Sequence, residues 1–306
     1  MRQAFCTGLV EQAGLPEFVF LTGDLGFKAL EPLQDALGPR FINAGISEQN
    51  MVSVAAGLAR SGLRPWAYSI APFLYARPFE QIRNDVCLHN LPVILVGNGG
   101  GYGYGVMGSS HHALEDYGSL LTLPHMRAFV PAFDSDVRSM IPMLMQCEGP
   151  VYLRLGLSEE PKGWPVPEYA PWRKLLCGNG PVLAGVGPLV GGTLTALEQL
   201  EEDVRPEVWL VTELPITNVP AEFIVSVRRT RRLFVVEEHT AHGGFGQMLV
   251  HHLAAAGEPL DSFIHKHALG YVSGLYGSQK FHRAECGLDP ASIVAAVSMQ
   301  CVPVIR

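Results

Sequence analysis

A continuous apolar run at residues 92–96, PVILV, constrains the fold of this chain most. A strand that is apolar on both faces is suited to a parallel sheet covered by helices on both sides. Further strands are predicted from the apolar runs at residues 18–21, 40–44, 66–74, 126–131 and 150–155. Helical patterns separate these runs, at residues 1–14, 51–60, 77–89 and 135–147. The alternation predicts an α/β domain with a mostly parallel sheet, which we place at residues 1–161.

A second, smaller α/β domain is expected after a linker. Residues 162–173 (KGWPVPEYAPWR) are rich in proline and aperiodic, and we place the linker at residues 162–177. The alternation then resumes, with strands predicted at 181–186, 207–211 and 232–237 and helices predicted at 192–201 and 243–256. The second domain is therefore expected at residues 178–306.

The composition excludes several classes of protein. A net charge of −7 without a basic cluster argues against nucleic-acid binding. No apolar run approaches the roughly 18 residues that span a membrane. The first residues are predicted to enter a helix directly and lack the apolar core of a signal peptide, so a cytoplasmic protein without a leader is expected. The apolar content of 48% indicates that a partner covers some apolar surface.

Glu48 is the most informative single residue of the chain. It follows a predicted strand and precedes the small-residue helix pattern at residues 51–60, MVSVAAGLAR. A carboxylate at the mouth of a buried helix is costly unless it has a partner. Two interpretations are open. Either Ser47 caps the helix and Glu48 lies favourably in its first turn, or Glu48 meets a ligand nitrogen in an apolar pocket.

Other polar residues also allow two interpretations each. Asp24, at the carboxyl end of a predicted strand, either contacts a ligand or belongs to a simple turn. The glycine-rich stretch at residues 97–108 indicates either close backbone approach to another group or a mobile loop. His111 either starts a polar helix or faces a substrate. Arg154, on an apolar strand, either pairs with an acid or meets a phosphate or carboxylate, whereas residues 237–239 are interpreted as structural contacts.

Five motifs occur in a definite order along the chain. They are Gly23-Asp24-Leu25, Gly45-Ile46-Ser47-Glu48-Gln49, the aromatic stretch at 66–74, the glycine-rich stretch leading to His111, and Glu115-Asp116. This order resembles the C-terminal half of thiamine-diphosphate enzymes of the transketolase type. The resemblance covers nearly the whole chain and implies a pyrimidine-binding domain followed by a transketolase C-terminal domain. The related 1-deoxyxylulose-5-phosphate synthases and the β subunits of 2-oxo-acid dehydrogenases share much of the pattern.

The resemblance implies that this chain binds the aminopyrimidine half of thiamine diphosphate. Glu48 would hydrogen-bond to the pyrimidine N1′, which favours the imino tautomer whose nitrogen takes the proton from C2 of the thiazolium ring. An aromatic side chain would stack on the pyrimidine, and Phe73 is the first choice. For each aromatic residue of this stretch the alternative is a role in the core. The residues implied to contact the cofactor are Glu48, Phe73, Tyr75, Tyr68, Asp24 and Ile46.

Four further positions concern the substrate. His111 falls where transketolases have a His that contacts oxygens of the donor, so it is the second implied catalytic residue. Arg154 falls near an Arg that holds substrate phosphate. Met107 stands where the family has an Asp that contacts a sugar hydroxyl, and Gly99 stands where a phosphate-binding His is common. These departures indicate an atypical or non-phosphorylated substrate, although Lys28 or Arg154 could supply the missing charge.

A partner subunit is expected because the chain contains no Gly-Asp-Gly motif, which helps to hold the diphosphate and a divalent metal in this family. An N-terminal subunit would supply that motif together with Mg²⁺ or Ca²⁺, in an α2β2 assembly with cofactor sites between subunits. This chain itself is expected to ligate no metal. The predicted function is a split transketolase that transfers a two-carbon ketol unit from a ketose or related donor to an aldehyde. The alternatives are the β subunit of a 2-oxo-acid dehydrogenase and a non-catalytic partner subunit with the same fold.

Overall fold

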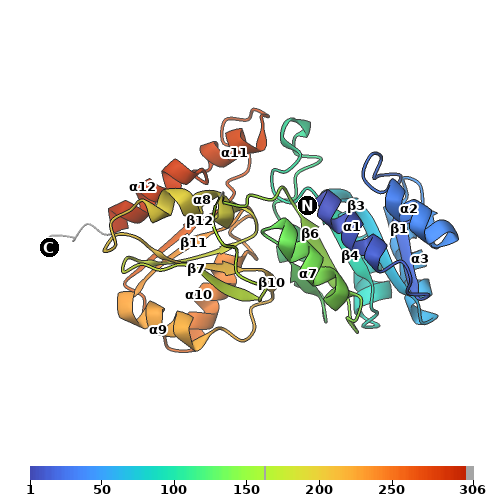
Figure 1. The fold of residues 1–306 in the computed structure, drawn as a ribbon, viewed down its shortest axis with the longest axis horizontal. Coiled ribbons are helices and arrows are strands. Elements are labelled where there is room, and N and C mark those ends of the chain that lie inside the picture. Colours follow the sequence, from blue (N-terminus) through green and yellow to red (C-terminus); the bar gives the residue numbers. More distant parts are fainter. Residues whose placement is uncertain (162, 301–306) are drawn as a thin grey trace.

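Two sheets organise the computed structural model, which describes residues 1–161 and 163–300 (Figure 1). The first sheet has seven strands in the order β10-β5-β6-β4-β3-β1-β2. Its neighbouring strands pair in parallel, and β10 pairs antiparallel with β5. The strands are β1 (Phe18–Thr22), β2 (Phe41–Asn43), β3 (Arg64–Ile70), β4 (Ile94–Asn98), β5 (Arg127–Phe129), β6 (Val151–Leu155) and β10 (Glu213–Leu214).

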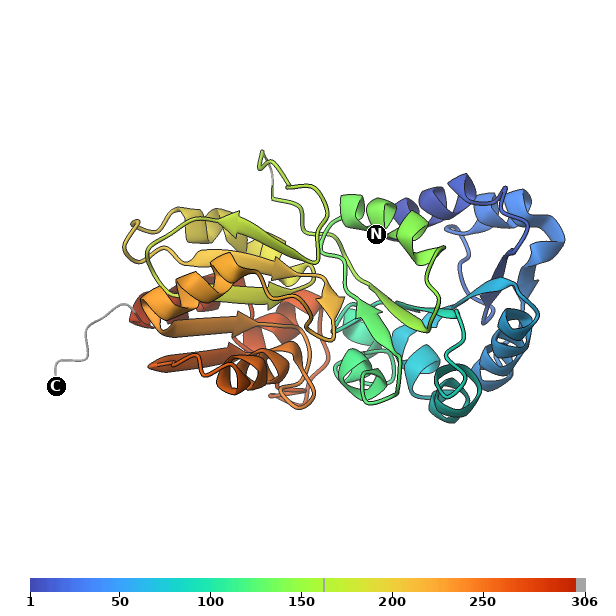
Figure 2. The ribbon, with the colours of Figure 1, turned by 90° about the horizontal axis from the view of Figure 1, so that it is seen from below.

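Helices cover both faces of the first sheet because its central strands are apolar on both sides (Figure 1 and Figure 2). Successive side chains of a strand point to opposite faces. Phe18 and Phe20 of β1 join the cluster beneath one set of helices, α1 (Arg2–Glu11), α2 (Glu31–Leu37) and α7 (Asp134–Leu144). Val19 and Leu21 join the cluster on the other face. That face is covered by α3 (Glu48–Arg60), α4 (Ala71–Tyr75), α5 (Phe79–Gln81), a π-helical segment (Ile82–Cys87) and α6 (Asp116–Leu120).

The second sheet has five strands in the order β12-β11-β8-β9-β7. The strands are β7 (Trp172–Leu176), β8 (Val182–Val186), β9 (Glu207–Val211), β11 (Arg232–Val236) and β12 (Ser262–Lys266); β7 is antiparallel to β9, and the other pairs are parallel. One face packs against α8 (Leu189–Glu198) and α12 (Pro290–Gln300), and the other against α9 (Ala221–Thr230) and α10 (Phe245–Ala255). The short helix α11 (Gln279–Glu285) lies beside the 3₁₀ turn Gly105–Met107 of the first unit.

The prediction of two α/β domains with mostly parallel sheets is confirmed, and several segments differ in detail. The aromatic stretch 66–74 is not one strand, because β3 ends at Ile70 and α4 begins at the next residue. The segment predicted as a linker, 162–177, contains β7, an edge strand of the second sheet. Its first residue, Lys162, and residues 301–306 of the second predicted domain lie outside the described part of the chain.

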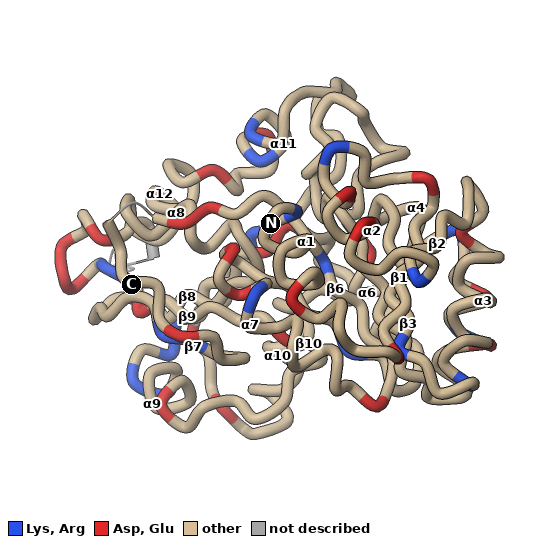
Figure 3. Tube along the Cα trace, turned by 45° about the vertical axis from the view of Figure 1, so that its right-hand side comes forward, with Lys and Arg blue, Asp and Glu red and all other residues tan. Residues whose placement is uncertain are grey.

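The two units share a continuous interior. β10 comes from the second half of the sequence but pairs with β5 of the first sheet, with Glu213 opposite Phe129. A single apolar cluster contains residues from both sheets, such as Leu21 and Val235. Lys and Arg are interspersed with Asp and Glu along both units (Figure 3). None of the helices in the described residues is both long and apolar enough to cross a bilayer.

Candidate functional site

Glu48 begins helix α3 and is buried, with 4% of its surface exposed. Ser47 occupies the N-cap position, but its side chain makes no capping hydrogen bond within the described chain. The capping role that the sequence allowed for Ser47 is therefore not realised in this structure. Glu48 does lie in the first turn, where the helix dipole favours a negative charge. β2 leads into this helix, so the carboxylate lies at the carboxyl edge of the first sheet, where open α/β folds bind ligands.

The Glu48 carboxylate is paired with two side chains. Nη1 of Arg77 donates to both carboxylate oxygens, at 3.1 and 3.0 Å, and the Ser69 hydroxyl donates to Oε1 at 3.4 Å. The Arg77 guanidinium also lies 3.8 Å from the centre of the Phe73 ring. Sequence reasoning missed Arg77, although the requirement that a buried carboxylate have a partner was a signal for a nearby cation.

A cavity of about 510 Å³ adjoins Glu48. Its size is in the range of sites for small molecules and cofactors. Ile46, predicted to contact the cofactor, lines it with a side chain that is 76% exposed. The residues that line this cavity are Ile46, Ser47, Glu48, Gln49, Asn50 and Arg77.

His111 lies next to Phe73, although 37 intervening residues separate them in the sequence. The centres of the two rings are 5.0 Å apart, with their planes steeply inclined at 66°. The glycine-rich stretch makes this approach possible because it folds back on itself, with paired hydrogen bonds between Gly101 and Ala113. The structure therefore brings Glu48, Phe73 and His111 together through Arg77, which contacts the first two.

Tyr104 is a second residue of this site that sequence reasoning missed. Its ring centre lies 5.7 Å from that of His111, and its hydroxyl accepts a hydrogen bond of 2.7 Å from Nδ2 of Asn98. Gly99 has a positive φ of +78°, and a Cβ at this position would lie 2.2 Å from the Tyr104 ring. Tyr104 thus fills the space beside the position where the family commonly has a His.

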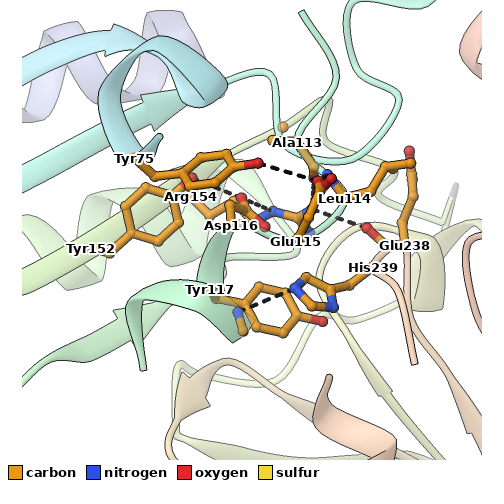
Figure 4. A network of polar contacts seen from close by, with 12 residues as sticks. Tyr75, Ala113, Leu114, Glu115, Asp116, Tyr117, Tyr152, Arg154, Glu238 and His239 are labelled. Carbon is orange, nitrogen blue, oxygen red and sulfur yellow. Dashed lines mark hydrogen bonds and ion pairs between the residues drawn. The ribbon is translucent and has the colours of Figure 1, made fainter. Parts of the chain in front are cut away.

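Two predicted cofactor-contacting tyrosines instead make structural contacts. Tyr68 is buried among aromatic residues such as Phe5, at 6.0 Å between ring centres, on the face covered by α1. Tyr75 donates a hydrogen bond of 3.2 Å to Oε2 of Glu115, and burial raises its pKa well above the ordinary value. The same Glu115 oxygen accepts the Leu114 amide, so Tyr75 anchors the segment after His111 (Figure 4). These positions support the core interpretation for both tyrosines.

Asp24, Lys28 and Met107 are exposed, and the described contacts do not bring them together with Glu48. Asp24 has a left-handed backbone with φ of 58° and accepts a hydrogen bond of 2.8 Å from Asn43, an arrangement typical of a turn. Lys28 lines a separate cavity of about 910 Å³, together with Arg2 at the start of α1.

Arg154 is buried in a polar network between the two units (Figure 4). Its Nε donates to Oδ2 of Asp116 at 2.7 Å, and its Nη2 donates to the backbone oxygens of Ala113 at 2.7 Å and Glu238 at 3.0 Å. Tyr152 donates to the same Asp116 oxygen. Of the two interpretations that the sequence allowed, this geometry supports pairing with an acid, and it does not bring Arg154 together with Glu48.

Residues 237–239 also make the structural contacts that the sequence indicated. The Glu238 carboxylate accepts the Tyr102 amide at 2.6 Å and pairs with Arg283. The His239 ring stacks on Tyr117 with 3.9 Å between ring centres. The bond from Tyr102 to Glu238 and the stack of His239 on Tyr117 join the second unit to the loop and helix that follow β4. They therefore support the segment that carries His111.

Two family models match the chain. The model described as "Transketolase, pyrimidine binding domain" matches residues 8–160, and "Transketolase, C-terminal domain" matches residues 177–293. Among curated proteins, the chain is 31% identical over 268 residues to one subunit of an apulose-4-phosphate transketolase of Actinobacillus succinogenes, covering 83% of each chain. It is 32% identical to a 1-deoxy-D-xylulose-5-phosphate synthase of Geobacter sulfurreducens, covering 84% of this chain but 41% of that longer one.

Solved structures give the same assignment. A structure titled "Split gene transketolase, inactive beta4 tetramer" superimposes with a TM-score of 0.81 at 30% identity, covering 98% of this chain and 97% of the other. The transketolase of Leishmania mexicana shares the fold, with a TM-score of 0.78 at 16% identity, and 45% of its length is covered. The resemblance predicted from the motifs is confirmed, and the chain belongs to the transketolase family.

Proposed function

We propose that this chain is the pyrimidine-binding subunit of a split transketolase that uses thiamine diphosphate. The complete enzyme would transfer a two-carbon ketol unit from a ketose or related donor to an aldehyde acceptor. The observation that carries the proposal is the buried Glu48 carboxylate beside a cavity of about 510 Å³. Arg77 contacts both Glu48 and Phe73, and Phe73 lies next to His111. The similar apulose-4-phosphate transketolase chains are each named as one subunit of their enzyme, which supports the split organisation.

The residues present fit the aminopyrimidine half of the cofactor. Glu48 offers a carboxyl group shielded from water, and Phe73 offers a flat apolar face beside it. When bound, thiamine diphosphate supplies a thiazolium carbon acid that adds to carbonyl groups and acts as an electron sink. The Glu48 carboxyl would hydrogen-bond to a ring nitrogen, and burial makes that hydrogen bond stronger than it would be in water.

His111 is proposed to hold the oxygens of the donor substrate. It is partly exposed beside Phe73, and a neutral imidazole can donate one hydrogen bond and accept another. Nδ1 of His111 lies 2.9 Å from the Ser110 hydroxyl, which orients the ring and leaves Nε2 for a substrate oxygen. The Tyr104 ring packs beside His111 and limits the access of water to this end of the site.

A sugar phosphate is the proposed class of substrate. Support for it comes from the similar transketolases, which are named for apulose-4-phosphate, a phosphorylated compound. The cavity that Arg2 and Lys28 line also carries Glu11 and Glu31, so its charges balance, and Arg154 is committed to Asp116. We propose that Met107, exposed at the end of the glycine-rich stretch, lies at the entrance and contacts the acceptor.

The partner is proposed to be an N-terminal transketolase subunit that carries Gly-Asp-Gly and holds the diphosphate through Mg²⁺ or Ca²⁺. The superposition on a split-gene transketolase of nearly the same length supports a divided site. The described residues contain no group of three or more His, Cys, Asp or Glu side chains arranged to hold a metal ion. The assembly would be α2β2, with this chain as β.

The test is reconstitution with a subunit of this partner type. Ketol transfer is measured with a panel of ketose phosphates, and pyruvate is included as a donor because synthases of deoxyxylulose phosphate are among the similar proteins. The complex should be active and each subunit alone inactive. Glu48→Gln should lower kcat by at least ~100-fold, the order expected for a general acid–base group, with an unchanged unfolding temperature. Full activity of Glu48→Gln would refute the assignment of the cofactor site.

A further inference from the structure

Arg77 occupies both surfaces that a pyrimidine ring would need in this site. Its Nη1 bonds to both oxygens of Glu48, at 3.1 and 3.0 Å. Its guanidinium carbon lies 3.8 Å from the centre of the Phe73 ring, which is the separation of two flat groups in van der Waals contact. A second flat ring cannot enter between Arg77 and Phe73 at that distance. Nη1 of Arg77 also occupies the edge of the carboxylate, between its two oxygens, where a ring nitrogen would bond.

The guanidinium is well suited to this position. It is planar, it stacks on aromatic faces, and it donates hydrogen bonds to carboxylates in its own plane. An aminopyrimidine has the same combination of a flat face and hydrogen-bonding nitrogens at its edge. Arg77 therefore satisfies the buried Glu48 in the same way that the ligand would.

The Arg77 side chain is also free to move out of this position. Its side chain is 45% exposed, whereas that of Glu48 is 4% exposed, so the arginine can rotate into solvent while the carboxylate stays. The backbone is held in place, since the Arg77 carbonyl accepts a hydrogen bond of 3.3 Å from Nε2 of Gln49. The change is thus confined to the long, flexible side chain.

We propose that Arg77 is a placeholder for the pyrimidine ring, which keeps Glu48 paired in the free subunit and is displaced when thiamine diphosphate binds. This inference rests on the proposed function. Arg77 is a positioning residue, because it acts by holding and then releasing Glu48 and Phe73. Its displacement lowers the affinity for the cofactor, since an ion pair and a cation–π contact must first be broken. The two contacts together correspond to roughly a tenfold change in affinity.

The test measures the dissociation constant of thiamine diphosphate in the reconstituted complex by calorimetry. Arg77→Ala should bind the cofactor about tenfold more tightly than the wild type. Arg77→Lys keeps the charge but loses the planar stacking and should be intermediate. Arg83→Ala, which removes an exposed arginine six residues further on, is the matched control and should leave the affinity unchanged. In a Glu48→Gln background the gain from Arg77→Ala should shrink, because the ion pair is already gone.

Weaker or unchanged binding by Arg77→Ala would overturn the inference. A placeholder lowers the affinity for the cofactor, so its removal must raise the affinity, whereas removal of a merely structural arginine does not. Arg77→Gln, which also removes the charge and the guanidinium group, serves as the second variant if the alanine variant does not fold. If the wild-type complex binds no thiamine diphosphate at all, the proposed function fails as well. If the wild type binds and Arg77→Ala binds no more tightly, only the placeholder role is lost.

Discussion

The ion pair between Arg154 and Asp116 gives the sharpest prediction about stability. Both side chains are buried, and Asp116 Oδ2 accepts hydrogen bonds from Arg154 at 2.7 Å and from Tyr152 at 2.7 Å. The other oxygen, Oδ1, has no hydrogen-bond partner among the described residues. Arg154→Met preserves much of the volume but leaves a buried carboxylate with one donor. It also removes donors from the carbonyl oxygens of Ala113 and Glu238.

Removing one partner of a buried ion pair costs about 3–5 kcal/mol. For a domain of this size each kcal/mol lowers the unfolding temperature by ~2–4 °C, so we expect a decrease of roughly 6–20 °C. Differential scanning calorimetry of the purified chain measures it. The matched control is Arg127→Met, which breaks the 2.9 Å pair with Glu213 where the arginine is 52% exposed. That variant should lose about 1 kcal/mol or less. Equal shifts for the two variants would refute the reasoning.

Three further predictions follow from single contacts. Gly99→Ala should lower the unfolding temperature more than Gly62→Ala. Both glycines have positive φ, but a Cβ at Gly99 would meet the Tyr104 ring, whereas a Cβ at Gly62 would meet no described atom within 4 Å. Equal decreases of the unfolding temperature in a thermal scan would show that the Tyr104 ring moves aside without cost, contrary to this prediction. Phe73→Leu should weaken thiamine diphosphate binding by the complex by roughly tenfold through loss of the stacking face, measured by calorimetry. Burial holds the pKa of His239 below its ordinary value of 6.5. The unfolded chain therefore takes up a proton below pH 6.5 before the folded chain does, and stability falls as the pH falls. His239→Gln should flatten this fall between about pH 7 and 5 in urea titrations, and an unchanged slope would contradict it.

The sequence predicted the residues whose chemistry is local and missed those whose role depends on a distant partner. Glu48 could be singled out because a carboxylate before an apolar helix is costly wherever it lies. His111 could be singled out because it ends a stretch of glycines. The need of Glu48 for a partner indicated a cation but not which one, and nothing indicated Tyr104. An arginine after an aromatic turn and a tyrosine among glycines look like ordinary surface residues. Only the folded loop places Tyr104 over Gly99 and Arg77 over Phe73.

The fold was predictable for a related reason, and its errors have a physical cause. Strands apolar on both faces can lie only inside a covered parallel sheet, and this indicated the central strands correctly. β7 and β10 are edge strands at the junction of the two units, and they are short or flanked by proline. Their pairing comes from tertiary contacts rather than from hydrophobic periodicity, and this is why β7 was predicted as linker. Arg154 was ambiguous because its partner, Asp116, belongs to a helix after a different strand.

The order of strands explains how residues from separate connections meet at this site. Three crossover connections contribute to it, after β2 for Glu48, after β3 for Phe73 and after β4 for His111. β3 and β4 are interior strands, but β2 is the last strand of the sheet. The chain after the edge strand β2 nevertheless carries the Glu48 carboxylate back to Ser69, near the end of the interior strand β3. The half-exposed Arg77 covers the carboxylate there, and the apolar side chain of Ile46 is exposed. The exposed side chains of Ile46 and Arg77 leave this site open on its outer side, where the proposed partner subunit would close it. Displacement of Arg77 would then be the step at which the proposed cofactor gains access to Glu48 and Phe73.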